Sequence, residues 1–331
     1  MRILITGAGG PAAVAFIRAV EAPEIECFAG DVDPYGAGLY LVPPPNRWIL
    51  HKASDERFID DVLNRCIDAD IDVVVPGIDP ELLPFARRRE DFEAHSVRLL
   101  LSDESALQLC VDKWELVSAC AEVCAVPKTA IVDDSFARAE WTPPFIVKPR
   151  KGSGGRGVRE IRELSAMADV PCDGTLIAQE LLPGREYSVD VLCDRQSTPL
   201  AVVPRSRLKI DSGIAITGHT VRDERLVKGA SAVAKRIGLS YVANIQFRED
   251  ASGTPKLLDV NARFPGSMPL TIAAGVDMPN LALDVLRGRA IDPKALEYRE
   301  TAITRTWENH VIPLEELRAL EDAAATRDRR R

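Results

Sequence analysis

The sequence FIVKPRKGSGGRGV, residues 145–158, holds the combination of features that decides the fold. It opens with three apolar residues, Phe145 to Val147, whose composition predicts a buried strand that delivers Lys148 at its end. The basic segment that follows, residues 151–157, contains four glycines, which leave the backbone free to turn its N–H groups toward an anion. We interpret this strand and loop as a cover for phosphate groups. A hairpin tip that carries surface cations is the alternative interpretation.

The loop differs from a Walker loop, in which the lysine follows the glycines in the order G-x-x-x-x-G-K-[ST].

The net charge of −8 argues against a broad basic face for nucleic acid. No apolar run approaches the length that spans a membrane, and the first residues lack the pattern of a signal peptide. The seven cysteines include no C-x-x-C pair and are expected to be free thiols. These features predict a cytoplasmic protein that binds neither nucleic acid nor membrane.

The first residues predict the opening of a Rossmann-like domain. The strand RILIT, residues 2–6, runs into a glycine turn and then into a helical segment, residues 13–20. Gly7, Gly9 and Ala12 satisfy the pattern G-x-G-x-x-A, and Asp31 follows about twenty residues later, as in dinucleotide-binding proteins. Close packing of strand and helix explains the same glycines equally simply. The turn therefore leaves an NAD-dependent oxidoreductase as one alternative.

Further strand and helix units predict that this domain extends over residues 1–102. Asp79 and Glu81 directly follow the strand predicted at residues 71–76, at the edge where open α/β sheets bind ligands. A helix cap is the equally weighted alternative for Asp79. The other expected elements are strands at 26–29 and 97–101 and a helix at 58–66.

A second helix start lies at Asp112, which has the sequence of a capping box. Lys113 then occupies the first turn, where the helix dipole disfavours a cation unless an anionic ligand is nearby. Beyond the glycine loop, residues 185–191 alternate polar and apolar side chains, as an antiparallel strand does. A helix is expected at 226–238 and two strands at 242–247 and 255–261.

These motifs together resemble the ATP-grasp superfamily, in particular single-unit relatives of carbamoyl-phosphate synthetase large-subunit domains. The resemblance covers about residues 105–290 and is carried by Asp112-Lys113, FIVKP, KGSGGRGV, QELLPGREYSVDV, NIQF and LLDVNAR. It implies a mixed α/β and α+β protein, with a Rossmann-like (pre-ATP-grasp) domain followed by a two-subdomain ATP-grasp fold. The implied divisions are a lid with the glycine loop at 103–180, a subdomain with the metal site at 181–310, and a helix with a basic tail at 311–331.

The resemblance also assigns roles. It places Lys113 and Lys148 at the ATP phosphates, and Glu186 at the ribose. It implies that Glu180 and Leu182 present backbone groups to the adenine, and that Arg263 stabilises the transferring phosphoryl group. The remaining nucleotide-binding residues that it implies are Lys151, Gly152, Ser153, Gly154, Gly155, Gly157 and Gln179, and the residues facing Mg²⁺ are Gln246, Asp259 and Asn261.

The implied function is an ATP-dependent ligase that joins a small carboxylic acid to an amine or related nucleophile through an acyl phosphate. The implied cofactors are ATP and Mg²⁺, with Mn²⁺ as a substitute, and a homodimer is left open. Hard oxygen ligands suit Mg²⁺, although Asp259 is shorter than the Glu of many relatives and Gln246 is uncharged, which puts a second metal in doubt. An ATP-binding protein without ligase turnover is the main alternative.

Arg205 and Arg207 flank Ser206 on an expected strand edge, so an extended backbone points both side chains to one face. Two adjacent like charges are unfavourable unless an anion lies between them. We therefore predict that the pair faces the cleft and binds a carboxylate or the transferred phosphate, since a planar guanidinium matches both anions. Two solvated surface arginines are the alternative.

Overall fold

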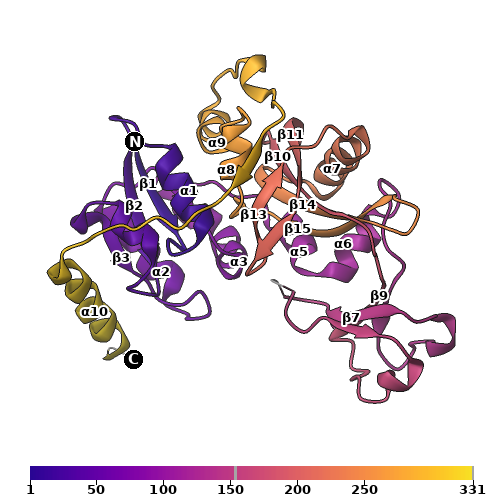
Figure 1. The fold of residues 1–331 in the computed structure, drawn as a ribbon. Coiled ribbons are helices and arrows are strands. Elements are labelled where there is room, and N and C mark those ends of the chain that lie inside the picture. Colours follow the sequence, from indigo (N-terminus) through magenta and orange to yellow (C-terminus); the bar gives the residue numbers. More distant parts are fainter. Residues whose placement is uncertain (153–154, 330–331) are drawn as a thin grey trace.

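The structure, a computed structural model, describes residues 1–152 and 155–329 and begins with a parallel sheet of order β3-β2-β1-β4-β5 (Figure 1). In the central strand, Ile3, Leu4 and Ile5 are all buried, because helices cover both faces of the sheet. The predicted Rossmann-like opening is confirmed. The strands are β1 (Arg2–Thr6), β2 (Glu26–Asp31), β3 (Arg47–Ile49), β4 (Val73–Val75) and β5 (Arg98–Leu99).

Two helices of this domain start at the carboxyl edge of the sheet. Helix α1 follows the glycine turn after β1, with Pro11 in its first turn, and α3 follows β4. Both N-termini therefore point toward the edge where α/β sheets bind ligands. The helices are α1 (Pro11–Ala19), α2 (Phe58–Asp68), α3 (Asp79–Arg87) and α4 (Arg89–Ala94), with short 3₁₀ turns η1 (Ala37–Leu41) and η2 (Pro44–Asn46).

The glycine loop belongs to a small antiparallel sheet of order β6-β9-β7-β8, which projects away from the N-terminal domain (Figure 1). Strand β7 continues to Pro149, one residue past the predicted end at Lys148. Pro149 fits there because β8 pairs only with residues 145–147, so its missing N–H leaves no bond unmade on that side. The elements are α5 (Glu104–Val111), α6 (Lys113–Cys120), β6 (Thr129–Val132), η3 (Arg138–Glu140), β7 (Phe145–Pro149), β8 (Arg159–Ile161), η4 (Leu164–Met167) and β9 (Leu176–Glu180).

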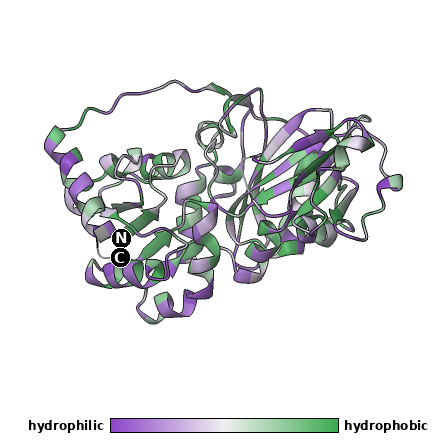
Figure 2. Cartoon of the chain, turned by 90° about the horizontal axis from the view of Figure 1, so that it is seen from below, coloured by the Kyte–Doolittle hydropathy of each residue, from purple (hydrophilic) through white to green (hydrophobic). Residues whose placement is uncertain are grey.

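A second antiparallel sheet, of order β11-β10-β14-β15, lies between the N-terminal domain and this lid (Figure 1). Apolar residues concentrate on its strands and on the inner faces of the helices (Figure 2). Helix α7 ends as predicted at Gly238, which adopts φ 78°. The elements are β10 (Glu186–Cys193), β11 (Pro199–Ser206), α7 (Glu224–Ile237), β14 (Tyr241–Glu249), β15 (Pro255–Asn261), α8 (Pro269–Ala273) and α9 (Met278–Arg287).

A third sheet and a returning helix complete the chain. The sheet combines β12 (Lys209–Asp211), β13 (Ile214–His219) and β16 (Ala302–Thr304), and η5 (Pro293–Leu296) precedes β16. The chain then crosses back to the N-terminal domain, where α10 (Leu314–Arg329) contacts β3 (Figure 1). Leu320 and Ala324 are buried there, and Glu316 pairs with Arg47 at 2.6 Å. Among residues 1–152 and 155–329, no helix combines the length and hydrophobicity that crossing a membrane requires.

Candidate active site

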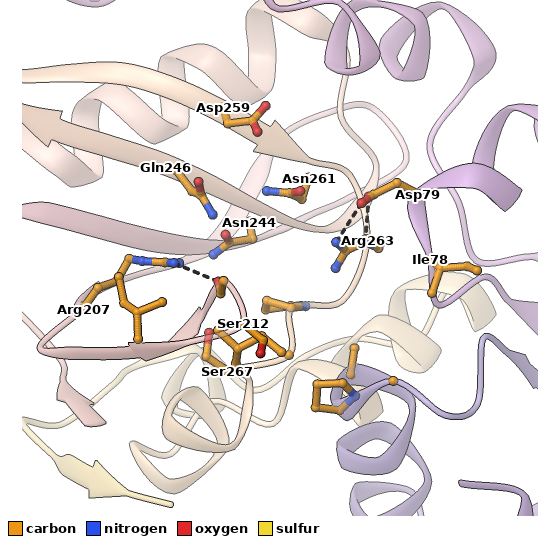
Figure 3. A pocket seen from close by; sticks show the side chains of 18 of the residues that line it. Ile78, Asp79, Arg207, Ser212, Asn244, Gln246, Asp259, Asn261, Arg263 and Ser267 are labelled. Atoms are coloured by element: carbon orange, nitrogen blue, oxygen red, sulfur yellow. Dashed lines mark hydrogen bonds and ion pairs between the residues drawn. The ribbon is translucent and has the colours of Figure 1, made fainter. Parts of the chain in front are cut away.

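A cavity of about 430 Å³ lies where the N-terminal domain meets the central antiparallel sheet (Figure 3). The N-terminal domain contributes the first turns of α1 and α3, including Ile78 and Asp79. The central sheet contributes polar side chains of β10, β14 and β15, and the following loop contributes Arg263. Of the predicted site residues, the cavity is lined by Gly155, Glu186, Arg207, Gln246, Asp259, Asn261 and Arg263.

The predicted metal residues share one face of the sheet. Gln246 on β14 lies opposite Asp259 on β15, and Asn244 lies opposite Asn261. Because strand side chains alternate between faces, residues two apart point the same way, and all four line the cavity (Figure 3). Asn244 is not among the residues predicted from the sequence. Its position two residues before Gln246 was the signal that could have identified it.

Two buried lysines lie near Asp259. Burial raises the pKa of the Asp259 carboxyl, and the charges of Lys113 and Lys148 partly oppose that effect. Burial likewise lowers the pKa of Lys148 to about 8. Lys113 follows the predicted cap, since Asp112 Oδ1 accepts from the backbone N–H of Trp114 at 3.1 Å. The arrangement places two cations beside a carboxylate, which suits a metal-bound polyphosphate.

The glycine loop is attached to the start of α6. The backbone N–H of Lys113 donates to Arg150 O at 3.0 Å, and Lys113 Nζ donates to Gly152 O. Gly152, Gly155 and Gly157 all have positive φ values, from 69° to 133°, which explains why glycine recurs in this loop. Lys151 pairs with Asp112 through a single backbone bridge and is exposed. The predicted Ser153 and Gly154 lie outside the described residues.

Three predicted nucleotide-binding residues, of which Glu180 and Leu182 were expected at the adenine, lie at the end of β9 and just after it. Gln179 is fully buried, and its Nε2 donates to Thr129 Oγ1 at 3.0 Å, while its Oε1 has no partner among the described residues. A buried acceptor without a partner costs free energy, so this oxygen suits a ligand that donates a hydrogen bond. The Glu180 carboxylate pairs with Lys256 at 2.8 Å, and Leu182 is buried.

Arg263 forms an ion pair that joins the two domains. Its Nε lies 2.7 Å from Asp79 Oδ1, and its Nη2 lies 2.9 Å from Asp79 Oδ2 (Figure 3). Asp79 is the first residue of α3, and Ile78 occupies the cap position without a side-chain hydrogen bond. Of the two alternatives for Asp79, the helix cap is therefore wrong, since the carboxylate faces the cavity and Arg263.

The prediction that Arg205 and Arg207 both face the cleft is wrong for Arg205. Its guanidinium is only 1% exposed and lies 2.5 Å from the buried carboxylate of Asp190. Asp190 also accepts from Asn244 and Thr271, so Arg205 completes a buried network beneath the cavity. An unpaired carboxylate at that depth would be costly, which is the physical reason for the inward orientation.

Arg207, in contrast, lines the cavity. Its Nε lies 2.9 Å from Glu186 Oε1, and its Nη1 donates to Ser188 Oγ at 3.1 Å. Burial lowers the pKa of the Arg207 guanidinium, while the Glu186 charge opposes this. The carboxylate predicted to hold the ribose and the arginine predicted to bind an anion are therefore paired with each other. Anion binding by Arg207 stays a prediction.

Asp31 and Gly36, which belong to the same domain, contact the glycine turn that follows β1. The backbone N–H of Gly9 donates to Asp31 Oδ2 at 2.6 Å, so a group that could bind pyrophosphate already has a partner. Gly36 also packs against this turn, because a Cβ on Gly9 would lie 3.1 Å from Gly36 Cα. These contacts favour a packing role for the glycines over NAD binding.

Comparison with known proteins gives two family matches within this chain. Residues 3–100 match the family "PylC-like, N-terminal domain", and residues 173–311 match "ATP-grasp in the biosynthetic pathway with Ter operon". A carbamoyl-phosphate synthase of Methanobrevibacter smithii is 25% identical over 75% of this chain and 73% of its own length. A D-alanine–D-alanine ligase of an Anaeromyxobacter species is 26% identical over 51% of this chain and 62% of its own length.

Solved structures share the fold. Biotin carboxylase from Campylobacter jejuni matches 90% of this chain and 73% of its own length, with a TM-score of 0.73 and 19% identity. N5-carboxyaminoimidazole synthetase from Staphylococcus aureus, in complex with ADP, matches 88% of this chain and 78% of its own length, with a TM-score of 0.69 and 15% identity. The match over residues 173–311 identifies an ATP-grasp domain, and together with the shared fold it confirms the predicted resemblance and the predicted fold. The homologues are ATP-grasp ligases, which is the class that the sequence predicted.

Proposed function

We propose that this enzyme uses ATP to phosphorylate a small carboxylic acid and then transfers the acyl group to an amine or related nucleophile. The observation that carries the proposal is the convergence of Asp259, Asn261 and Arg263 in one cavity, with Lys113 and Lys148 close to Asp259. A carboxylate is a poor electrophile at neutral pH, so activation must precede attack by the nucleophile. The cavity provides a cation, a metal-binding face and a junction between domains for that purpose.

The described residues fit ATP and Mg²⁺ as cofactors. The carboxylate of Asp259 and the amide oxygens of Gln246 and Asn261 are hard ligands, and Mg²⁺ commonly completes such a partial shell with water and phosphate oxygens. Mn²⁺ accepts the same oxygen donors. The unpartnered Oε1 of Gln179 offers an acceptor to an adenine amino group. When bound, the metal would neutralise charge on the phosphates during transfer.

The side chains would act chiefly by position and charge, as phosphoryl transfer requires. Lys148, with a pKa of about 8, is mainly protonated at neutral pH and would bind phosphate oxygens together with Lys113. Arg263 would stabilise the charge that develops as a carboxylate oxygen attacks the γ-phosphorus and the bond to ADP breaks. The nucleophile then forms the new bond to the acyl carbon. The bond between the acyl carbon and the bridging oxygen breaks, phosphate leaves with that oxygen, and the attacking amine releases a proton to solvent.

A nucleotide-binding assay and a phosphate-release assay together test the proposal. ATP with Mg²⁺ at about a hundred times its dissociation constant should stabilise the fold by roughly 2.7 kcal/mol. Lys148→Ala should remove most of that stabilisation, whereas Lys294→Ala, a change to an exposed lysine outside the cavity, should leave it unchanged. ATP-dependent phosphate release should then appear with a subset of carboxylic acids supplied with mixed amines. Stabilisation by ATP without release from any acid would favour the nucleotide-binding alternative.

A further inference from the structure

The ion pair between Asp79 and Arg263 forms part of the cavity wall, and its two members come from different domains. The Asp79 side chain is 30% exposed and that of Arg263 is 21% exposed, so both retain surface toward the cavity (Figure 3). Arg263 follows Asn261 by two residues, which places the pair next to the face proposed to bind the metal. A substrate bound in this cavity would therefore lie close to this pair.

Both members of the pair retain hydrogen-bonding capacity. Arg263 has five N–H groups, of which two contact Asp79 and one, on Nη1, donates to Phe264 O at 3.2 Å. A carboxylate offers about four lone-pair positions, and the two contacts to Arg263 use two of those on Asp79. Arg263 can therefore still donate hydrogen bonds to an anion, and Asp79 can still accept hydrogen bonds from a cation.

The first turn of α1 adds positive potential beside Arg263. This helix has nine residues, and its cap residue, Gly10, provides no side-chain hydrogen bond to the first N–H groups. Those groups have no partner inside the helix, and the helix dipole favours an anion near them. Pro11 packs closely on the loop that carries Arg263, because a Cβ on Gly266 would lie 3.0 Å from Pro11 Cγ. Arg263 and the first turn of α1 thus both contribute positive potential on the side of the cavity wall that would bind an anion.

A substrate that fills the cavity displaces water from this wall, so the hydrogen-bonding positions of Asp79 and Arg263 that their own ion pair does not use then need partners. A simple carboxylic acid satisfies Arg263 and the start of α1 but brings a second negative charge toward Asp79. A substrate with an ammonium group next to its carboxylate satisfies both groups at once. We propose that the acid activated by this enzyme is an amino acid, with its carboxylate at Arg263 and its ammonium group at Asp79. This inference rests on the proposed function, because it names the class of acid that the ligase would activate.

The inference is tested with ATP-dependent hydroxamate formation, in which hydroxylamine is the nucleophile. The probes are free α-amino acids, the matching acids that lack the amino group, and the N-acetylated amino acids. We expect kcat/KM for the accepted amino acid to exceed that of its two analogues at least tenfold, because a charge-assisted hydrogen bond to Asp79 is lost in both. Phosphate release is measured in parallel.

Asp79→Asn provides the residue-level test. This variant should lower kcat/KM for the amino acid at least tenfold more than it lowers kcat/KM for the analogue without the amino group, so that the preference for the amino acid is lost. Asp103→Asn is the matched control, because Asp103 also lies at a helix start and pairs with an arginine, but it does not line the cavity. The control variant should retain the wild-type preference for the amino acid.

The other outcomes separate the inference from the function on which it rests. Equal use of the amino acid and its analogue without the amino group by the wild-type enzyme would overturn the inference and leave the ligase proposal intact. If Asp79→Asn lowered activity equally with both compounds, Asp79 would be a residue that only positions Arg263. Absence of hydroxamate and of phosphate release with every acid, while ATP still stabilises the fold, would overturn the ligase proposal itself.

Discussion

Glu81 is a buried carboxyl group whose ionisation should control the stability of the N-terminal domain. It lies in the first turn of α3, is only 3% exposed, and accepts a hydrogen bond from Thr6 Oγ1 at 2.6 Å. Burial raises its pKa from 4.5 to about 8, the Thr6 hydrogen bond opposes this, and the charge of Asp31 adds to the increase. Glutamine has nearly the same shape and cannot ionise. Glu81→Gln therefore isolates the cost of the buried charge.

The magnitude follows from proton linkage. Between pH 4.5 and 8 the folded state holds a proton on Glu81 that the unfolded state has lost. The stability that this proton contributes is fully present below pH 4.5. It is lost progressively as the pH rises from there through the folded-state pKa of about 8. Each pH unit in this window is worth about 1.4 kcal/mol. From pH 5 to pH 8, Glu81 should thus lower the free energy of unfolding by about 4 kcal/mol, and the glutamine variant should escape that loss.

Urea denaturation of both proteins at pH 5, 6.5 and 8 measures the effect. The unfolding free energy of Glu81→Gln minus that of the wild type should increase steadily over this series, and the subtraction cancels all groups that titrate alike in the two proteins. Glu93→Gln, which changes an exposed glutamate of α4, should give a difference that does not vary with pH. A difference for Glu81→Gln that is also independent of pH would refute the assignment of a raised pKa to this carboxyl.

Three further predictions concern the central sheet and the lid. Arg205→Leu should lower the free energy of unfolding by about 3–5 kcal/mol, because it leaves the buried Asp190 without a cation; a loss below about 1 kcal/mol in urea denaturation would contradict this. ATP affinity, measured by titration calorimetry, should fall as the pH rises from 7 to 9, because Lys148 loses its proton near pH 8, and Lys148→Arg should flatten that dependence. Asp259→Asn should reduce phosphate release at least about tenfold while weakening ATP binding less, since the metal counters charge that grows during transfer; kinetics that show the reverse would make Asp259 a residue for affinity only.

The sequence predicted the elements well where the signal is local. Asp112 caps α6 as its capping-box sequence indicated, and Gly238 ends α7 because glycine readily adopts the positive φ required there. The resemblance assigned both Gln246 and Asp259 to Mg²⁺, and the structure places them opposite each other because β14 and β15 are joined by a short turn, which leaves little freedom in their pairing. In each case the residues that decide the geometry lie close together in the chain.

The incorrect and missing predictions concern partners that are distant in sequence. Extended geometry at the end of β11 put Arg205 and Arg207 on one side of the chain, but it could not show that Arg205 pairs with Asp190 and Arg207 with Glu186, both on the neighbouring strand β10. Burial of a guanidinium is favourable only when a carboxylate is already present, so the orientation of Arg205 depends on the register of two strands rather than on its own neighbours. Asp79 and Arg263 are an extreme case, since their contact joins positions 184 residues apart and exists only after two domains have packed together. The amino-acid specificity that we propose for the site would therefore depend on domain packing, and the sequence motifs on either side indicate the chemistry without indicating the substrate.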